Sequence, residues 1–304
     1  MAQTIYNALE LIFGGGLAAD LSDWMTTLFG TVLSLLDGGS LFTTAMTVFA
    51  ALACTMLTLF FFMELVSQAN RELFSLEKLI VMFVKFLTGF VVLLVLPDIV
   101  VGLARIGNYL YLSMKDGPIA DALLTTSDAG LSFTFGGTEY ASFPDWASVS
   151  TAFEDQYSSI FKAFGTYIEC LILNFLGWIV KFAGYFVCTQ NAVMILARAI
   201  FMPVAVVQCF EDGSRSSGIR YIKAFAAECI TMAIIIVLIY AASTVSGGLM
   251  SNQLSTMGLG TTVTFDNMDS VIQLKNTAVL LIPQFVAVGG MAGGGKLTRE
   301  ILGA

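Results

Sequence analysis

The sequence predicts an all-α integral membrane protein with about five transmembrane helices. Hydrophobic residues make up 57% of the 304 residues and charged residues only 12%, about half the charged fraction of a typical soluble domain. The mean hydropathy is +0.84. Several uncharged stretches approach about 20 residues, the length that crosses the bilayer core. A single soluble core of this size does not hide so much apolar surface, so we expect the helices to lie in a membrane.

The composition excludes several functional classes. The chain has no histidine, which excludes His-based acid–base enzymes, His–zinc proteases and haem–His sites. A net charge of −8 argues against nucleic-acid binding through a basic surface. We therefore expect no catalytic residues, no cofactor and no metal. The cysteines lie in or beside apolar runs without C-x-x-C spacing, which is typical of small apolar residues in helices: Cys54, Cys170, Cys188, Cys209 and Cys229.

Residues 1–40 are predicted to form an external amphipathic N-terminal region. Gly14, Gly15 and Gly16 interrupt it, and apolar residues then recur at helical spacing. Two arrangements are open for this helix: it lies flat on the membrane surface, or it packs on the transmembrane helices. The apolar positions are Leu21, Trp24, Leu28, Val32, Leu35 and Leu36.

Five later segments have the length and composition of membrane spans. Two fall in the region 41–104 and three in the transmembrane core 163–304, and the few charged residues within them lie singly. The segments are 41–63, 79–96, 163–187, 224–245 and 277–294.

The segment 192–210 is apolar but contains Arg198 and Pro203. We expect it to be re-entrant or to lie in the interface. The alternative treats it as a sixth span, which would place the basic loop 211–223 outside the membrane. Positive charge in short loops favours the inside, so five spans agree better with the charges.

The charge distribution predicts an external N-terminus and an internal C-terminus. Residues 1–70 contain no Lys or Arg, and the long segment 105–162 is acidic. Basic residues gather instead in loop 211–223 and in the C-terminal tail, at Arg215, Arg220, Lys223, Lys296 and Arg299.

The external region 105–162 is predicted to contain a β-hairpin. Residues 131–135 alternate apolar and polar side chains, Gly136 and Gly137 follow, and 138–143 is β-tolerant. Residues 261–265 are β-prone and fall on the same side of the membrane. We expect a small external cap that contains strands.

Four charged residues in or near the spans are candidate channel or core polar groups: Glu169, Lys181, Arg198 and Glu228. A charge in hydrocarbon is costly, so each is expected to face the protein interior or water. Arg198 and Lys181 are candidate partners for the two carboxylates. The alternative to a functional role is a set of ion pairs that fixes helix register.

The glycine-rich tail resembles a phosphate-binding loop up to Lys296. The loop requires Ser or Thr after the lysine and a βαβ context, and this chain has Leu297. We expect close helix packing through small residues instead, at Gly289, Gly290, Gly293 and Gly294.

A stretch of about 25 residues resembles the TrbL-like family, the polytopic membrane subunits of type IV secretion and conjugal transfer machines. The resemblance comprises ARAIFMPVA at Ala197–Ala205, then Glu211, then SGIRYIK at Ser217–Lys223 before a long apolar span. The predicted topology is also similar, although the large C-terminal domain of some members is absent here.

This resemblance implies a subunit of the inner-membrane channel through which DNA with attached protein is transferred. It implies partners of four kinds: membrane lipid, other copies of the chain, other machine subunits including cytoplasmic ATPases, and the transient DNA–protein substrate. Arg215, Arg220 and Lys223 are the candidate contacts to inner partners. The competing hypothesis is a secondary transporter or ion channel with an intramembrane carboxylate site.

Overall fold

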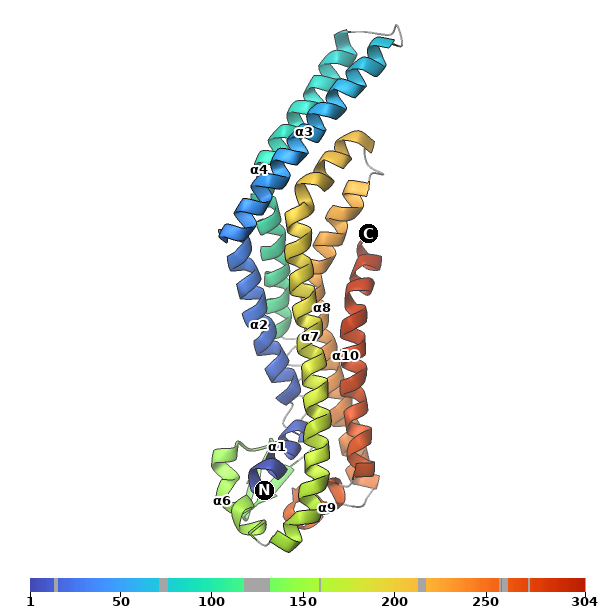
Figure 1. Ribbon diagram of the computed structural model, residues 1–304. Coiled ribbons are helices and arrows are strands. Elements are labelled where there is room, and N and C mark those ends of the chain that lie inside the picture. Colours follow the sequence, from blue (N-terminus) through green and yellow to red (C-terminus); the bar gives the residue numbers. More distant parts are fainter. Residues whose placement is uncertain are drawn as a thin grey trace. The chain divides into compact units, whose positions relative to one another are not determined.

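Long helices make up most of the computed structural model (Figure 1). It describes residues 1–13, 16–70, 76–117, 132–158, 160–212, 217–256, 258, 262–272 and 274–303. Within these ranges the chain forms two compact units. Met1–Met25, Leu112–Val187 and Ile234–Gly293 make the first unit, and Thr26–Tyr111, Cys188–Ala233 and Gly294–Ala304 make the second.

Four helices among the described residues are long and apolar enough to cross a membrane, as in a multi-pass membrane protein. They are α3 (Ser40–Asn70), α4 (Leu76–Lys115), α7 (Ile160–Asp212) and α8 (Ser217–Thr256). The first four predicted spans lie in these helices. The structure thus gives four such helices where the sequence predicts five spans.

The fifth predicted span, 277–294, lies in helix α10 (Leu274–Leu302). The helix itself agrees with the prediction. The side chains of residues 274–281 lie outside the described part of the structure, so the crossing of this segment stays a prediction.

The re-entrant alternative for 192–210 is wrong, whereas a position of this segment in the membrane interface stays a prediction. These residues continue α7 without a break from the preceding predicted span, so neither a chain reversal nor a separate sixth span fits. Pro203 removes only one backbone donor from the helix. Arg198 is paired inside the protein with Glu228, so its charge does not force the helix to end.

Helix α2 (Gly16–Leu36) confirms the predicted N-terminal helix, and it packs against other helices of the chain. In the first unit Leu21 lies against Gly184, where an added Cβ would come within 2.8 Å of its Cδ2. In the second unit Phe29 stacks on Tyr111 at 6.2 Å between ring centroids. The buried face differs from the predicted one, because Trp24 is 41% exposed. The buried apolar positions are Leu21, Met25, Phe29, Val32 and Leu36.

The predicted hairpin is confirmed in the first unit. Strands β1 (Ser132–Phe135) and β2 (Thr138–Tyr140) pair antiparallel. Gly136 and Gly137 between them have φ of 59° and 81°, the two positive values of a type I′ turn. Strand β3 (Thr262–Thr264) pairs parallel with β1 and completes a three-stranded sheet.

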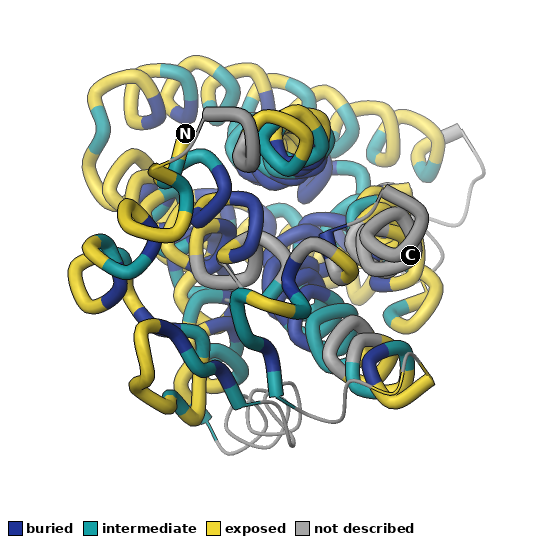
Figure 2. Tube along the Cα trace, turned by 90° about the horizontal axis from the view of Figure 1, so that it is seen from below, coloured by how far each residue is buried: buried dark blue, intermediate teal, exposed yellow. Residues whose placement is uncertain are grey.

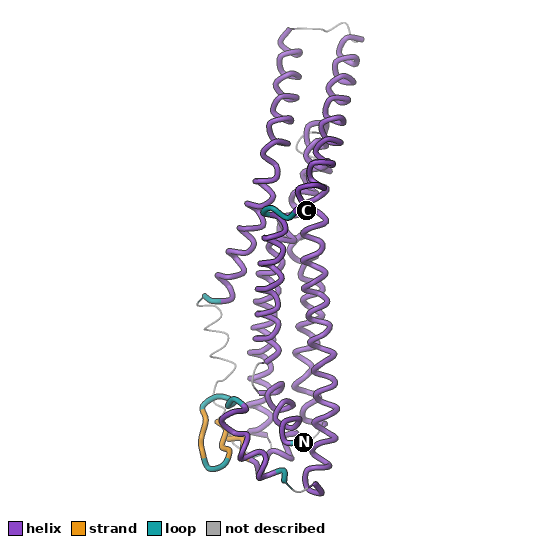
Figure 3. The backbone as a smooth tube through the Cα atoms, turned by 60° about the vertical axis from the view of Figure 1, so that its left-hand side comes forward, coloured by secondary structure: helices purple, strands orange, loops and turns teal. Residues whose placement is uncertain are grey.

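The sheet shares an aromatic core with three short helices: α1 (Ala2–Phe13), α6 (Trp146–Gln156) and α9 (Phe265–Ile272). Phe153 of α6 lies 5.2 Å from Phe135 of β1 between ring centroids, and Tyr6 of α1 lies 5.8 Å from Phe153. Figure 3 shows the strands near the N-terminal helix. The sequence does not predict the packing of α1 in this core, which gives the N-terminus a fixed place in the first unit.

Burial differs strongly among the apolar helices, and Figure 2 colours the described residues by how far each is buried. Of the most apolar 18 consecutive residues in each helix, 61% are buried in α8, against 17% in α3 and 22% in α4. Apolar side chains such as Leu41, Leu94 and Leu76 are more than two-thirds exposed. Exposed apolar surface of this extent requires lipid or another protein chain to cover it.

Candidate functional site

A buried carboxylate with two arginine partners forms the main polar cluster of the second unit. Glu228 belongs to the buried face of α8, which also carries Phe225, Thr231 and Met232 at helical spacing. Its side chain is 4% exposed. Arg198 of α7 places its Nη2 3.7 Å from Glu228 Oε1, and Arg299 of α10 pairs with the same oxygen. Three helices therefore meet at one charge.

The cluster carries one formal negative charge and two positive charges. Arg198 is 16% exposed and Arg299 39%, so the three groups lose much of their hydration. A charge in such a place is retained only when an opposite charge or a hydrogen bond compensates it. The Nε atoms of both arginines are buried and have no hydrogen-bond partner among the described residues.

Hydrogen bonds around the cluster join the same three helices. Asn191 of α7 donates from Nδ2 to the backbone oxygen of Glu228 at 3.3 Å. Thr231 of α8 donates its hydroxyl to the hydroxyl of Thr298 in α10 at 3.2 Å, and Thr298 in turn donates to its own helix backbone. This arrangement holds α7, α8 and α10 in one register, and it fits the structural alternative considered from the sequence.

The two parts of the family-like motif, 197–205 in α7 and 217–223 in α8, contact one another. Tyr221 donates its hydroxyl to the backbone oxygen of Arg198 at 3.1 Å, and the guanidinium lies 5.7 Å from the centre of its ring. At Gly218 an added Cβ would come within 2.1 Å of the Ala205 oxygen. Only glycine permits the two helices to approach so closely at that point.

The structure separates the four predicted polar residues into three environments. Arg198 and Glu228 pair in the second unit. Lys181 pairs with Asp20 of α2 in the first unit. Glu169 is half-buried in α7 and has no ion-pair partner among the described residues. Among the predicted combinations, only the pair of Arg198 with Glu228 is present.

Sequence reasoning missed Arg299 as a partner of Glu228. The signal available was the spacing of Ala287, Met291, Gly294 and Thr298, which places one small or apolar stripe on the buried side of α10. Arg299 follows this stripe directly. In the sequence, Arg299 served only as one of the basic residues that indicate an internal C-terminus, so its pairing with Glu228 was not predicted.

A polar cavity of about 310 Å³ lies in the first unit beside the pair of Lys181 and Asp20. Glu10 of α1 and Trp178 of α7 also line it. Asn174, another lining residue, donates to the backbone oxygen of Thr4 at 2.8 Å, which joins α7 to α1. The cavity is distinct from the Glu228 cluster.

The candidate residues for inner contacts are only partly described. Arg215 lies outside the described residues. Arg220 and Lys223 are exposed in the first two turns of α8. Lys223 Nζ donates to the backbone oxygen of Gly303 at 3.5 Å, so it also holds the end of the C-terminal segment.

The glycines predicted to mediate helix packing differ in their surroundings. Around Gly289 and Gly293 no atom lies within 4 Å of an added Cβ, so they make no close helix contact within the described chain. Gly290 meets only Leu238 at 3.8 Å. Gly294 is buried and accepts a hydrogen bond from Thr298 at 2.7 Å.

Comparisons with known proteins return no relative. No family model, no curated protein and no solved structure matches this chain.

Proposed function

We propose that the chain is a polytopic membrane subunit of a type IV secretion or conjugation machine, and that it forms part of the inner-membrane channel for a DNA–protein substrate. One observation carries the proposal. The two halves of the family-like motif, 197–205 and 217–223, form a single packed feature through Arg198, Tyr221 and Gly218. Contacts between the two parts of the motif support the resemblance to the family more strongly than a match of residue types alone.

The apolar helices support this function in a second way. Because α3 and α4 leave most of their apolar side chains uncovered within the described chain, they suit contact with lipid and with neighbouring copies or other subunits. Assembly into a homo-oligomer in the bacterial cytoplasmic membrane, with the N-terminus outside, belongs to the same proposal. Separate cytoplasmic ATPases would supply the energy.

Arg220 and Lys223 are the residues through which we propose contact with inner partners. Both are exposed at the start of α8, next to the motif. Two exposed positive charges attract phosphate groups or acidic side chains on an ATPase.

The test is complementation of an in-frame deletion in the bacterium that encodes the chain, with transfer frequency as the readout. We expect the deletion to abolish transfer and the double variant Arg220→Glu, Lys223→Glu to restore it poorly. The matched control, Arg220→Lys with Lys223→Arg, keeps both charges and is expected to restore transfer. Immunoblots of the membrane fraction compare protein amounts. Full transfer with the charge-reversed variant at normal amounts would overturn the inner-contact role.

The second candidate function is a transporter or ion channel. Glu169 favours it, because this half-buried carboxylate in α7 has no ion-pair partner among the described residues. This function requires solute or ion flux by the purified chain alone in liposomes, with loss of flux in Glu169→Gln. Such flux, together with normal transfer in the deletion strain, would replace the secretion proposal.

A further inference from the structure

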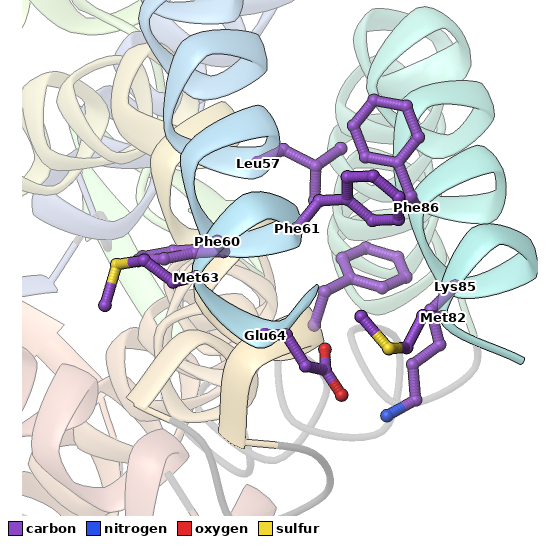
Figure 4. A pocket seen from close by; sticks show the side chains of 9 residues that line it. Leu57, Phe60, Phe61, Met63, Glu64, Met82, Lys85 and Phe86 are labelled. Carbon is purple, nitrogen blue, oxygen red and sulfur yellow. The ribbon is translucent and has the colours of Figure 1, made fainter. Parts of the chain in front are cut away.

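A second cavity, of about 300 Å³, lies in the second unit where α3, α4 and α7 meet (Figure 4). Seven apolar side chains and two charged ones line it. Four of the apolar residues are phenylalanines: Phe60, Phe61, Phe86 and Phe210. This volume is at the lower end of the range for small-molecule sites, and the aromatic lining suits a hydrocarbon chain.

The two charged residues of this pocket have opposite signs and come from different helices. Glu64 extends from α3 and Lys85 from α4, toward the same side of the cavity in Figure 4. Both are exposed, and neither has an ion-pair partner among the described residues. A carboxylate and an ammonium group are therefore both available beside an apolar cavity.

The depth of this pocket follows from the length of α3. The uncharged run 41–63 precedes Glu64 directly, and at 1.5 Å per residue it spans about 34 Å. The hydrocarbon core is about 30 Å thick, so the carboxylate of Glu64 lies at the headgroup level when α3 crosses the membrane. Lys85 reaches the same level with its long apolar stem.

We propose that this pocket binds a phospholipid whose headgroup carries both a phosphate and a primary ammonium, the chemistry of phosphatidylethanolamine. The phenylalanines contact an acyl chain, Lys85 binds the phosphate and Glu64 binds the ammonium. An anionic headgroup without an ammonium leaves Glu64 uncompensated and repelled by the phosphate. A quaternary ammonium cannot donate hydrogen bonds to the carboxylate, so the primary amine is preferred.

Native mass spectrometry of the full chain in mild detergent tests this proposal. The protein is exchanged into equal amounts of phosphatidylethanolamine, phosphatidylglycerol and phosphatidylcholine, and the retained lipids are counted. We expect the wild type to retain phosphatidylethanolamine in preference to both others. Glu64→Gln is expected to lower the ratio of phosphatidylethanolamine to phosphatidylglycerol by about two- to five-fold, the range for one exposed charge pair. Lys85→Gln is expected to lower the retention of both lipids.

The matched control is Glu77→Gln, an exposed carboxylate in the first turn of α4 that does not line the pocket. It is expected to leave all three lipid ratios unchanged, and helical circular dichroism checks that each variant is folded. Equal retention of the three lipids by the wild type would overturn the proposal. A shift by Glu77→Gln as large as that by Glu64→Gln, or no shift by Glu64→Gln, would also overturn it.

Discussion

At the residue scale, Glu228 joins three helices of the second unit through its two arginine partners. Its side chain is 4% exposed, and its two partners come from helices that precede and follow α8 in the chain. Removing one member of a buried ion pair leaves an uncompensated charge, which typically costs about 3–5 kcal/mol. The size of the effect should follow the burial of the residue that is changed.

We expect Glu228→Gln to destabilise the protein by about 3 kcal/mol or more, because two arginines then lose their counter-charge. Arg198→Gln should cost less, and Arg299→Gln the least, because Arg299 is 39% exposed. Unfolding in detergent, followed by circular dichroism, measures the order. Lys296→Gln is the control, since its pair with Glu300 is exposed and should change stability by less than about 0.5 kcal/mol. Equal effects of Glu228→Gln and Lys296→Gln would refute the cluster.

A triple variant separates a structural role of this cluster from a functional one. Replacing Arg198 by Met, Glu228 by Leu and Arg299 by Met removes every charge together and keeps similar volume. Such replacements of buried ion groups are often neutral or stabilising. If the cluster only holds α7, α8 and α10 together, the triple variant should recover most of the stability and support transfer. Recovered stability without transfer would assign the charges a function.

Tyr6 makes the stability of the first unit depend on pH. The pKa of its hydroxyl is raised from 10.0 to about 12, mainly by burial and in smaller part by the nearby negative charges of Glu10 and Asp145. The neutral hydroxyl donates to the backbone oxygen of Pro144 at 3.0 Å. Because the folded pKa is above the unfolded one, this contribution is complete below pH 10 and is lost as the pH rises toward 12.

We expect Tyr6→Phe to lose about 1 kcal/mol of stability at neutral pH, the typical contribution of one hydrogen bond. Between pH 10 and 12 the wild type should lose stability faster than the variant, because only the wild type must ionise this phenol. Denaturation curves at several pH values measure the difference. Parallel curves for the two proteins would contradict the role of Tyr6.

At the scale of elements, glycine positions show where helices approach most closely. Within the second unit, an added Cβ at Gly107 of α4 would come within 2.4 Å of the Cys229 backbone oxygen of α8. Gly102 lies in the same helix, and nothing lies within 4 Å of its added Cβ. The two positions form a matched pair for testing the contact between α4 and α8.

We expect Gly107→Ala to destabilise the protein by about 1–3 kcal/mol, because the backbones must separate. Gly102→Ala should be neutral or stabilise it by up to about 1 kcal/mol, since alanine favours the helix. Thermal unfolding in the same detergent compares them. If both substitutions stabilise, α4 and α8 are not in contact at Cys229.

The sequence predicted the elements whose signals are local. The pair Gly136–Gly137 between β-prone runs indicated the hairpin, and long apolar runs with few charged residues indicated the four helices. The re-entrant alternative at 192–210 is wrong, because the charge of Arg198 does not interrupt the helix. The pairing of that charge with Glu228, thirty positions later in the chain, is a tertiary contact that local composition does not contain.

The core of the first unit was also not predicted from the sequence, because it too depends on contacts between residues far apart in the chain. Strand β3 pairs in parallel with β1, and Ser132 and Thr262 share a hydrogen bond of 3.0 Å across the two strands. The sequence predicted only that 261–265 lies on the same side of the membrane as the hairpin. Neither the pairing nor the packing of α1 against Phe153 follows from periodicity.

At the scale of the whole molecule, the exposed apolar surface and the buried charges have two different roles. The apolar surface of α3 and α4 suits lipid or partner chains, and the Glu228 cluster fixes helices from different parts of the sequence. The channel subunit that we propose would require both properties, because such a subunit must assemble with neighbours and keep its own helices in place.

Photo-crosslinking to DNA during transfer tests the proposed function most directly. A photoreactive residue at Arg220, which is exposed at the start of α8, should crosslink transferred DNA or a machine ATPase, and only while the machine is energised. The same residue at Leu94, an apolar position of α4 that is 67% exposed, should give neither product. Crosslinks at Arg220 that depend on active transfer would support a subunit of the machine. Absence of DNA and ATPase products at Arg220, in cells that transfer at the normal frequency, would contradict it.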